Sequence, residues 1–596
     1  MPVKPITTEP GHSLPPDGPH TITLHYPGWA NALRFRDGDM TILTQLRSVY
    51  PRFGPFGLVR QLSVAIGKRL GIPETNGVLV FTDPAVFTEH KEHSLSEHRK
   101  ENKLSEGDLA FKVVDIHGIR LYLVIYHVEK TKGVIGLWQN AGIGISTRAA
   151  EELLRHVDGD DFRIVEWSGD ISNVPPPTYL PESKAHELLR RRISDLLHRA
   201  PVEPEKVKVT PDDVYLYQSG MAAIYRLNTA LTQRDPGTIL ALGAVFHSTW
   251  HLFEESLGGM KHFGQYTPEE LEEYLDAHYR GGKTISYAFL EFPSNPILVS
   301  ADLKQLRRIA DKYSFPLVVD DTVGSFANVD VLPAADLIIT SLTKSFSGYA
   351  DLLAGSVVLN PLSKFYTPAL KPAFTTAFHN EFFEGDAQKL LSNSDDYLTR
   401  TITLNRNAAS LARYLSNHQA TSSSASPIRE VLYPLTSPTL PNYQSFLRRP
   451  TPDFTPGYGC LLSVDFWTLD AAKAFYDNLQ VHCGPHLGAH RTLALPFNAT
   501  TFGADPVQAA YHAAYGARGT QLRVSVGLED EGELLEVFGE ALRRAEEVYR
   551  TGEGVVEGEE EEARAGEVLG EAGAASGASE VEVTAVAEEV AANYEA

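Results

Sequence analysis

Between about residues 207 and 359, segments typical of strands alternate with segments typical of helices, and this alternation constrains the fold more than any other feature. The strand-like segments are continuously apolar, as in Leu317-Val318-Val319, and do not alternate between apolar and polar residues. Continuously apolar strands that alternate with helices are typical of a parallel sheet covered by helices on both faces. Binding sites in such sheets lie at the carboxyl ends of the strands, so a functional site is expected there.

The pattern changes on either side of this stretch, which predicts several domains. Residues 166–386 are expected to form the large domain that contains the sheet. Residues 387–550 are expected to form a smaller α+β domain with a Ser-, Pro- and Thr-rich loop insertion at 420–456. Residues 1–165 mix strand-like and helical segments and form an N-terminal extension of unassigned role. The tail at 551–596 holds 13 Glu and one Arg, and this composition predicts disorder.

Charge, cysteine content and hydropathy narrow the class of protein. The net charge of −23, about half of it in the tail, argues against a nucleic-acid-binding surface. Cys460 and Cys483 have no CxxC spacing, so neither a disulfide framework nor a zinc site is expected, and no metal is predicted. No apolar run approaches the roughly 20 residues of a membrane span, and the N-terminus resembles no secretion or import signal. We therefore expect no membrane partner and a cytoplasmic location.

Two strand ends carry groups suited to a phosphate and to a cation. Ser219-Gly220-Met221 lies where a strand turns into a helix, and the free N–H groups at a helix start bind phosphate, although a glycine there is often only a tight turn. A later strand ends in Asp320 and Asp321, which point to opposite faces, so only one of them can face a site. A carboxylate in this place either keeps a ring nitrogen protonated or caps the following turn.

Two further segments carry a lysine and an arginine. Ser341 and Thr343 lie two residues apart, hence on one side of an extended chain, where both hydroxyls can donate to a phosphate. Lys344 follows a predicted buried strand, a place where an ammonium group can be desolvated enough to form an imine, although a lone lysine after a strand is usually a solvated charge. Arg523 lies inside an apolar strand and needs an anionic partner, either a substrate carboxylate or a buried salt bridge.

These segments occur in an order that resembles one family, the Cys/Met-metabolism enzymes of fold type I, which use pyridoxal 5′-phosphate (PLP). The family includes cystathionine γ-synthase, cystathionine lyases and O-acetylhomoserine sulfhydrylase. The resemblance covers about residues 175–550, and the N-terminal motifs HYPGW and YPRF are similar to the extension of fungal cystathionine γ-synthase-like proteins. The motifs that carry it are SGMAA from Ser219, EFPSNP from Glu291, VVDDT from Val318, SLTK from Ser341 and LRVSVGLED from Leu522.

The resemblance implies an α/β fold of PLP-dependent transferases, with a mainly parallel seven-stranded sheet, flanking helices, a smaller C-terminal α+β domain and an N-terminal extension. It makes Lys344 the Schiff-base lysine and catalytic proton shuttle, and Asp320 the partner of the pyridinium nitrogen. Arg523 would anchor the substrate carboxylate, and Asn295 would line the substrate side. The other implied cofactor ligands are Gly220, Met221, Ser341 and Thr343 at the phosphate and Phe246 on the ring.

The chain departs from the family pattern at three places. Phe246 stands where the family usually has a tyrosine, and a phenyl ring can stack on the cofactor but cannot relay a proton. Residues 175–182 contain no Tyr-x-Arg segment of the kind that reaches the phosphate in a neighbouring subunit. His486 stands where many relatives carry serine, which indicates a changed substrate pocket.

The resemblance further implies trans-sulfuration of small amino-acid substrates, in methionine biosynthesis, by a homodimer or homotetramer. The expected reaction is γ-replacement of an O-acyl-homoserine by L-cysteine to give cystathionine. Cystathionine lyase and O-acetylhomoserine sulfhydrylase activities stay open as alternatives. A hypothesis from another class, motivated by Phe246 and the missing Tyr-x-Arg segment, is a PLP-binding regulatory paralogue with weak activity.

Overall fold

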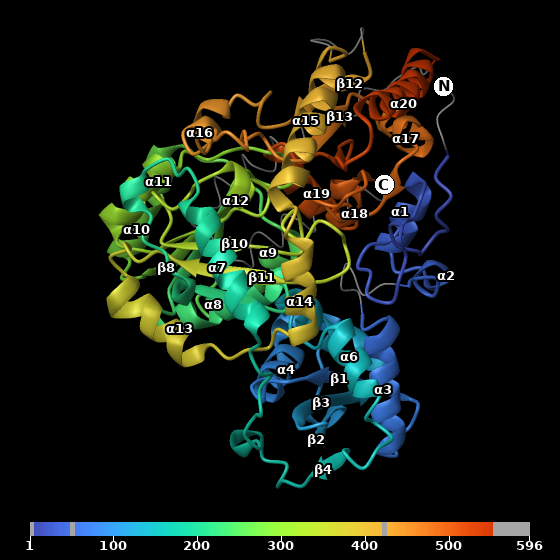
Figure 1. The fold of residues 1–596 in the computed structure, drawn as a ribbon, viewed down its shortest axis with the longest axis vertical. Coiled ribbons are helices and arrows are strands. Elements are labelled where there is room, and N and C mark those ends of the chain that lie inside the picture. Colours follow the sequence, from blue (N-terminus) through green and yellow to red (C-terminus); the bar gives the residue numbers. More distant parts are fainter. Residues whose placement is uncertain (1–4, 48–53, 420–425, 552–596) are drawn as a thin grey trace.

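The computed structural model describes residues 5–47, 54–419 and 426–551, and these residues form three sheets (Figure 1). The N-terminal sheet lies in a lobe at one end of the molecule, and the C-terminal sheet lies at the other. The tail that the sequence predicts to be disordered lies outside the described residues from residue 552 onward, and so do the YPRF residues 50–53.

The central sheet has seven strands in the order β5-β11-β10-β9-β8-β6-β7. Its strands are parallel except for β11, which runs antiparallel to both of its neighbours. The expected mainly parallel seven-stranded sheet is therefore confirmed. The strands are β5 Val214–Tyr217, β6 Thr238–Leu242, β7 Met260–Phe263, β8 Ile285–Glu291, β9 Leu317–Asp320, β10 Leu337–Thr340 and β11 Gly355–Leu359.

The central sheet is buried on both faces, which explains why its strands are continuously apolar. On β9, Leu317 and Val319 pack into one core, whereas Val318 packs into another on the opposite face. The first face is covered by α7 (Lys184–His198), α10 (Pro268–Arg280) and α11 (Leu303–Tyr313). The second face is covered by α8 (Gly220–Arg234) and α9 (His247–Glu254).

The N-terminal region is a four-stranded antiparallel sheet with helices on both sides. Its strands, in the spatial order β1-β3-β2-β4, are β1 Asn76–Phe81, β3 Ile119–His127, β2 Leu109–Ile116 and β4 Arg163–Val165. The helices α3 (Gly57–Arg69) and α6 (Thr147–Leu154) pack on one face. The helices α4 (Val86–Leu95) and α5 (Thr131–Ala141) pack on the other face and share one apolar core with α8 and α9. The N-terminal sheet and the central sheet are thus joined through α4 and α5.

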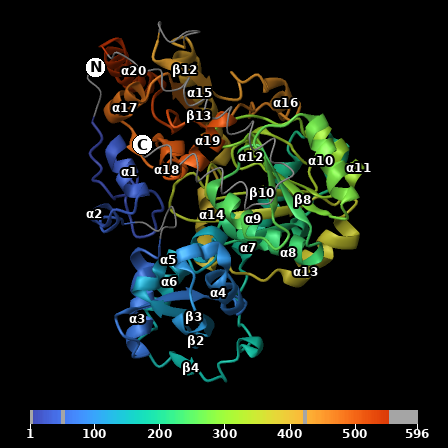
Figure 2. The same cartoon turned by 180° about the vertical axis from the view of Figure 1, so that it is seen from behind.

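The C-terminal sheet has the order β12-β13-β16-β15-β14 and is packed against α15 (Tyr397–Ser416), α17 (Leu469–Asn478) and α20 (Glu531–Thr551). Its strands are β12 Ile428–Leu432, β13 Leu461–Phe466, β14 His482–Cys483, β15 Leu493–Leu495 and β16 Leu522–Ser525. Near the chain start, α1 (Trp29–Arg36) lies beside α17 and α18 (Phe497–Thr501), as both ribbon views show (Figure 2).

The prediction of a loop insertion at 420–456 is wrong for part of this stretch. Its described residues include β12, which pairs antiparallel with β13 as the edge of the C-terminal sheet, and the short helix α16 (Leu440–Gln444). The strand was missed because it has five residues with a charged pair at its centre and lies between Ser- and Pro-rich segments. Pairing with β13 and burial of Ile428 and Val431 stabilise it despite this weak local pattern.

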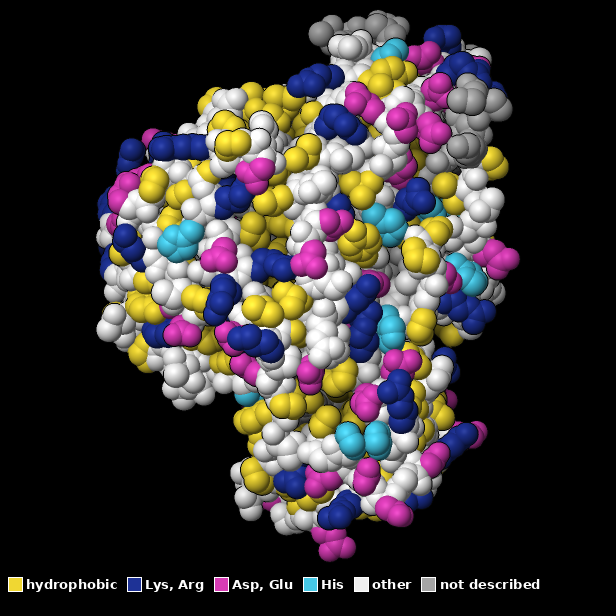
Figure 3. Space-filling view, viewed as in Figure 1, with side chains coloured by type: hydrophobic (Ala, Val, Ile, Leu, Met, Phe, Trp, Pro, Cys, Tyr) yellow, Lys and Arg dark blue, Asp and Glu magenta, His cyan; other side chains and the backbone are white. Residues whose placement is uncertain are grey.

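The molecular surface in Figure 3 shows basic and acidic side chains interspersed over the visible face, where neither sign gathers in a continuous patch. None of the helices within the described ranges has the combination of length and hydropathy that a membrane span requires.

Candidate active site

A cavity lies at the carboxyl ends of the central strands, and all nine residues predicted from the sequence line it. They come from elements far apart in the sequence, including the start of α8, the ends of β9 and β10, and β16 of the C-terminal sheet. The predicted residues are Gly220, Met221, Phe246, Asn295, Asp320, Ser341, Thr343, Lys344 and Arg523. Residues that also line it but were not predicted include Gln139, Glu291, Thr322, Leu353, Pro485 and Leu487.

The turn before α8 is shaped to receive an anion. Ser219 caps the helix, since its hydroxyl accepts from the Ala222 N–H at 2.9 Å. The N–H groups of the first helical turn, those of Gly220 and Met221 among them, have no acceptor within the helix and point out of its N-terminus. A Cβ on Gly220 would lie 2.8 Å from the Ser341 side chain, so only glycine allows these two segments to approach so closely. This cradle fits the phosphate of PLP.

The two aspartates at the end of β9 point to different environments, as strand geometry requires. Asp320 lines the cavity and accepts a hydrogen bond from the Thr322 N–H at 2.9 Å, whereas Asp321 accepts from the Thr340 hydroxyl at 2.6 Å. Burial raises the pKa of Asp320 to about 6. A cation facing it, such as a protonated pyridine nitrogen, would stabilise its carboxylate form, so Asp320 fits the ring of PLP.

Glu291 is a second buried carboxyl group that the sequence reasoning missed. It pairs across the sheet with Asp320 in the register of β8 and β9, and it accepts from the N–H groups of Phe246 at 2.5 Å and Asn295 at 3.1 Å. Burial and the neighbouring Asp320 charge raise its pKa well above the ordinary value. Its place at the end of an apolar strand, one strand before Asp320, is a signal that the EFPSNP motif contained.

Lys344 lies half-buried just after β10, in a loop whose backbone is held firmly. The Thr343 hydroxyl donates to the Ala354 carbonyl at 3.1 Å and accepts from the Ala354 N–H at 2.9 Å. Its single proton is therefore engaged at the start of β11, whereas the Ser341 hydroxyl has no hydrogen-bond partner within the described part of the chain. Of the two predicted phosphate donors, Ser341 is the better placed to donate.

Arg400 of α15 holds the segment that follows Lys344, and no sequence motif indicated this role. Its guanidinium, 4% exposed, donates to the carbonyl oxygens of Ser345 at 2.9 Å and of Phe346 and Ser347 at 3.1 Å each. It also donates to the carbonyl of Asn393 at 3.0 Å. Five N–H donors in a rigid plane make arginine the side chain suited to bind several carbonyl groups at once.

Arg523 reaches the cavity from β16, and its charge acts on the buried Glu291 carboxyl group nearby. It donates to the Asn295 side-chain oxygen at 3.1 Å and to the Pro485 carbonyl, and its guanidinium carbon lies 4.3 Å from the centre of the Phe497 ring. Burial, together with the charges of Lys344 and Arg523, lowers the pKa of His486 well below its ordinary value, so this ring is neutral. A buried guanidinium beside a neutral imidazole and an amide suits a carboxylate ligand.

Residues 175–182, which lack the Tyr-x-Arg segment, lie along the N-terminal sheet of their own chain. The Pro175 carbonyl accepts from the Tyr122 hydroxyl at 2.7 Å, and the Pro176 carbonyl accepts from Arg120 at 2.8 Å.

Known proteins match both the sequence and the fold. The sequence model of one protein family, the Cys/Met metabolism PLP-dependent enzymes, matches residues 209–543 of this chain. The chain is 31% identical to a cystathionine gamma-synthase-like protein of Aspergillus thermomutatus, over 90% of this chain and 94% of that protein. It is 28% identical to cystathionine gamma-synthase of Saccharomyces cerevisiae, over 90% of this chain and 99% of that protein. It is also 30% identical to an alanine racemase of Aspergillus violaceofuscus, over 90% of this chain and 96% of that protein.

Among solved structures, cystathionine gamma synthase from Xanthomonas oryzae pv. oryzae superposes with a TM-score of 0.51 at 23% identity, covering 61% of this chain and 87% of that chain. It shows that the fold is that of fold-type-I PLP enzymes. The family match, the fold and the fit of the cavity agree: the chain belongs to the Cys/Met metabolism PLP-dependent enzymes, and its cofactor is PLP.

Proposed function

We propose that the chain catalyses γ-replacement of an O-acyl-homoserine by L-cysteine, which gives cystathionine and a carboxylic acid. The observation that supports this most is the match to the Saccharomyces cystathionine gamma-synthase, which extends over 99% of that protein and so includes the N-terminal region. The proposed place of the reaction is the cavity that brings together Lys344, Asn295 and Arg523.

In this proposal some residues of the cavity bind the substrate and the cofactor, and Lys344 transfers protons. Arg523 binds the substrate α-carboxylate, and Asn295 fixes the orientation of Arg523 through their hydrogen bond. Asp320 holds a proton on the pyridine nitrogen. Bound PLP supplies an acceptor for the electron pair that is left when a proton leaves the substrate Cα. Lys344 takes that proton with its Nζ and returns protons to the substrate carbons.

The overall change breaks one bond and forms another at Cγ. The Cγ–O bond to the acyl group breaks, and the carboxylate leaves with its electron pair. The cysteine thiolate then forms the Cγ–S bond, and the thiol proton balances the charge of the released carboxylate. Apolar lining residues such as Leu353 and Leu487 exclude water, which would otherwise compete with the thiol.

The test is product analysis by mass spectrometry with the purified, PLP-loaded chain. O-acetyl- and O-succinyl-homoserine are each supplied with cysteine, with sulfide or without a thiol, and cystathionine is the expected product with cysteine. Homocysteine from sulfide alone would instead favour a sulfhydrylase, and 2-oxobutyrate without a thiol would favour an eliminating lyase. A chain that binds PLP but converts none of these substrates would favour the regulatory paralogue.

A second candidate is racemisation of an amino acid, which the alanine racemase relative favours because it matches over 90% of this chain. Chiral chromatography of L-alanine after incubation with the enzyme distinguishes the two. Formation of D-alanine without any cystathionine synthesis would replace the first proposal.

A further inference from the structure

The C-terminal end of α5, in the N-terminal region, lies directly on the turn that forms the phosphate cradle. The Ser219 hydroxyl donates to the Gly142 carbonyl at 2.7 Å. Gly142 ends α5 with a φ of +67°, and a Cβ on it would collide with Ser219, Met221 and Ala222. The N-terminal region therefore contacts the same residues whose N–H groups face the phosphate position.

Gln139 lies on this contacting face of α5. It precedes Gly142 by three residues, and residues three apart lie on the same face of a helix. It is half-buried and lines the cavity, and among the described lining residues it is the only one that precedes Ser219 in the sequence. Its neighbour Asn140 is also half-buried but does not line the cavity.

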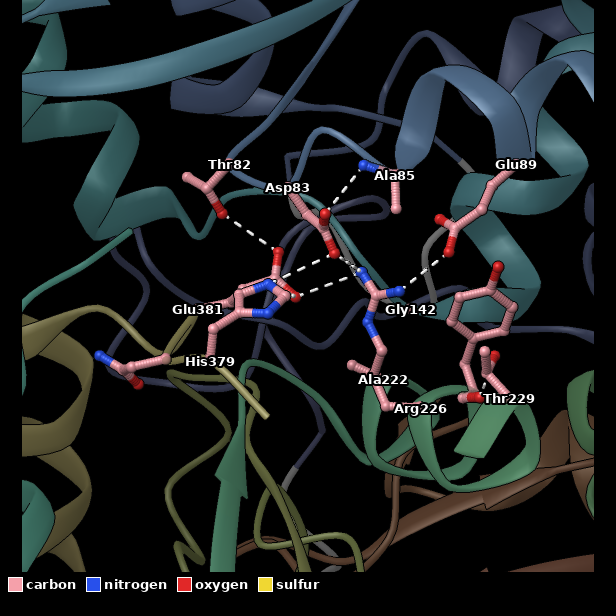
Figure 4. Close-up of polar contacts among 12 residues, drawn as sticks. Thr82, Asp83, Ala85, Glu89, Gly142, Ala222, Arg226, Thr229, His379 and Glu381 are labelled. Atoms are coloured by element: carbon pink, nitrogen blue, oxygen red, sulfur yellow. Dashed lines mark hydrogen bonds and ion pairs between the residues drawn. The ribbon is translucent and has the colours of Figure 1, made fainter. Parts of the chain in front are cut away.

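A buried ion network holds α8 and the N-terminal region in this position (Figure 4). Arg226, two turns along α8 from the cradle, donates to Asp83 at 2.6 Å and to Glu89 at 2.9 Å, both in the N-terminal region. It also approaches Glu381 at 3.4 Å, and Glu381 accepts from the Thr82 hydroxyl at 3.1 Å. With α8 fixed at both its start and its middle, the position of Gln139 relative to the cradle is defined.

We propose that Gln139 binds the cofactor phosphate through its side-chain amide, so that the N-terminal region completes the cofactor site of its own chain. The carboxamide offers two N–H donors without adding a charge. Donation to a phosphate oxygen is a hydrogen bond to an ionised acceptor, which is stronger than a bond between neutral groups. The N-terminal region thereby acquires a ligand-binding role that its fold alone does not indicate.

The test compares two ligands that differ only in the phosphate. The full-length chain is freed of cofactor and titrated with PLP and with pyridoxal, and binding is followed by the visible absorbance. Gln139→Leu is expected to weaken PLP binding about ten- to a hundredfold while leaving pyridoxal binding within about threefold. Gln139→Glu, which places a negative charge beside the phosphate, should weaken PLP binding further. Asn140→Leu is the matched control and should leave both affinities unchanged.

Two outcomes would overturn the proposal. Equal weakening of PLP and pyridoxal by Gln139→Leu would mean that Gln139 acts through the fold of the site and not on the phosphate. Unchanged affinity for both ligands would mean that it does not contact the cofactor at all. The pyridoxal titration also reports whether the variant folds. No substrate is present, so the result is independent of the reaction proposed above.

Discussion

At the scale of single residues, the proposal for Lys344 makes a direct prediction. Lys344→Ala should still bind PLP through the phosphate cradle but should lose the visible absorbance band of the lysine-bound cofactor, and activity should fall by several orders of magnitude. Absorbance spectra of the purified variant check the first point, and product assays check the second. Lys364→Ala, at an exposed lysine that does not line the cavity, should keep the wild-type band. A wild-type band in Lys344→Ala would exclude this lysine.

The raised pKa of Asp320 predicts that the stability of the cofactor-free chain depends on pH. Burial raises its pKa from 3.8 to about 6, so the folded state favours the protonated group. The resulting stabilisation is complete below about pH 4 and is lost as the pH rises through about 6. It amounts to at most about 3 kcal/mol of unfolding free energy. Urea denaturation between pH 4 and 7 should show a smaller decline for Asp320→Asn than for the wild type, and parallel curves would contradict the prediction.

The same aspartate predicts a difference in cofactor binding. PLP should bind at least tenfold more weakly to Asp320→Asn at pH 7.5, because the variant cannot hold the ring nitrogen in its protonated form. Asp321→Asn provides the matched control, since Asp321 faces Thr340 and not the cavity. A titration in which both variants lose the same affinity would argue against the assignment of Asp320.

The sequence places Asp320 and Lys344 at or just after the ends of strands, where parallel topology brings side chains together, and both line the cavity. The strand pattern alone could not predict which of the two aspartates would face the cavity, because this depends on the register of β9 between β8 and β10, and only the family resemblance selected Asp320. It also could not predict that the Thr343 hydroxyl bonds Ala354, since that contact forms only when β11 lies beside β10. Contacts across the fold of this kind leave no local pattern in the sequence.

At the scale of elements, α15 holds the loop that carries Lys344 through Arg400, so substitution of Arg400 should change both the stability of the fold and the affinity for PLP. Arg400→Met would leave four buried carbonyl groups without a donor and should lower the unfolding free energy by about 3 kcal/mol or more. It should also weaken PLP binding, because the loop after Lys344 loses its support. Arg400→Lys should restore part of both properties, whereas Arg413→Met on the exposed face of α15 should change neither. Lower stability with unchanged PLP affinity would show that Arg400 supports the fold but not the site.

Helices and strands were predicted where the hydrophobic pattern was long, and a strand was missed where tertiary contacts determine the secondary structure. The alternating strands and helices between residues 207 and 359 were predicted because the strands are continuously apolar and are separated by helical segments. The strand β12 was missed because its partner β13 lies about thirty residues further along the chain, beyond a Pro- and Ser-rich segment. An edge strand that depends on such a partner has little propensity of its own.

At the scale of the whole molecule, the structure changes how the N-terminal region is understood. The sequence pattern alone separates residues 1–165 from the central sheet, because their strands need not belong to it. In the structure, the apolar core on one face of the central sheet continues through α4 and α5 to the N-terminal sheet. A shared core of this kind couples the stability of the two parts, since neither can bury these side chains alone.

We therefore predict that the N-terminal sheet and the central sheet unfold together. In hydrogen exchange at rising urea concentration, the amides of β3 and of β8 should lose protection at the same midpoint. Arg226→Met removes the cation that three buried or half-buried carboxylates share. It should therefore lower the free energy of unfolding by about 3–5 kcal/mol and shift the urea midpoints of β3 and β8 by the same amount. Arg234→Met, at the exposed end of the same helix, should leave them unchanged. Loss of protection in β3 well before β8 would show instead that the N-terminal region unfolds as an independent unit. PLP affinity should then fall over the same range of urea concentration in which β3 loses protection, because Gln139 would leave the cradle.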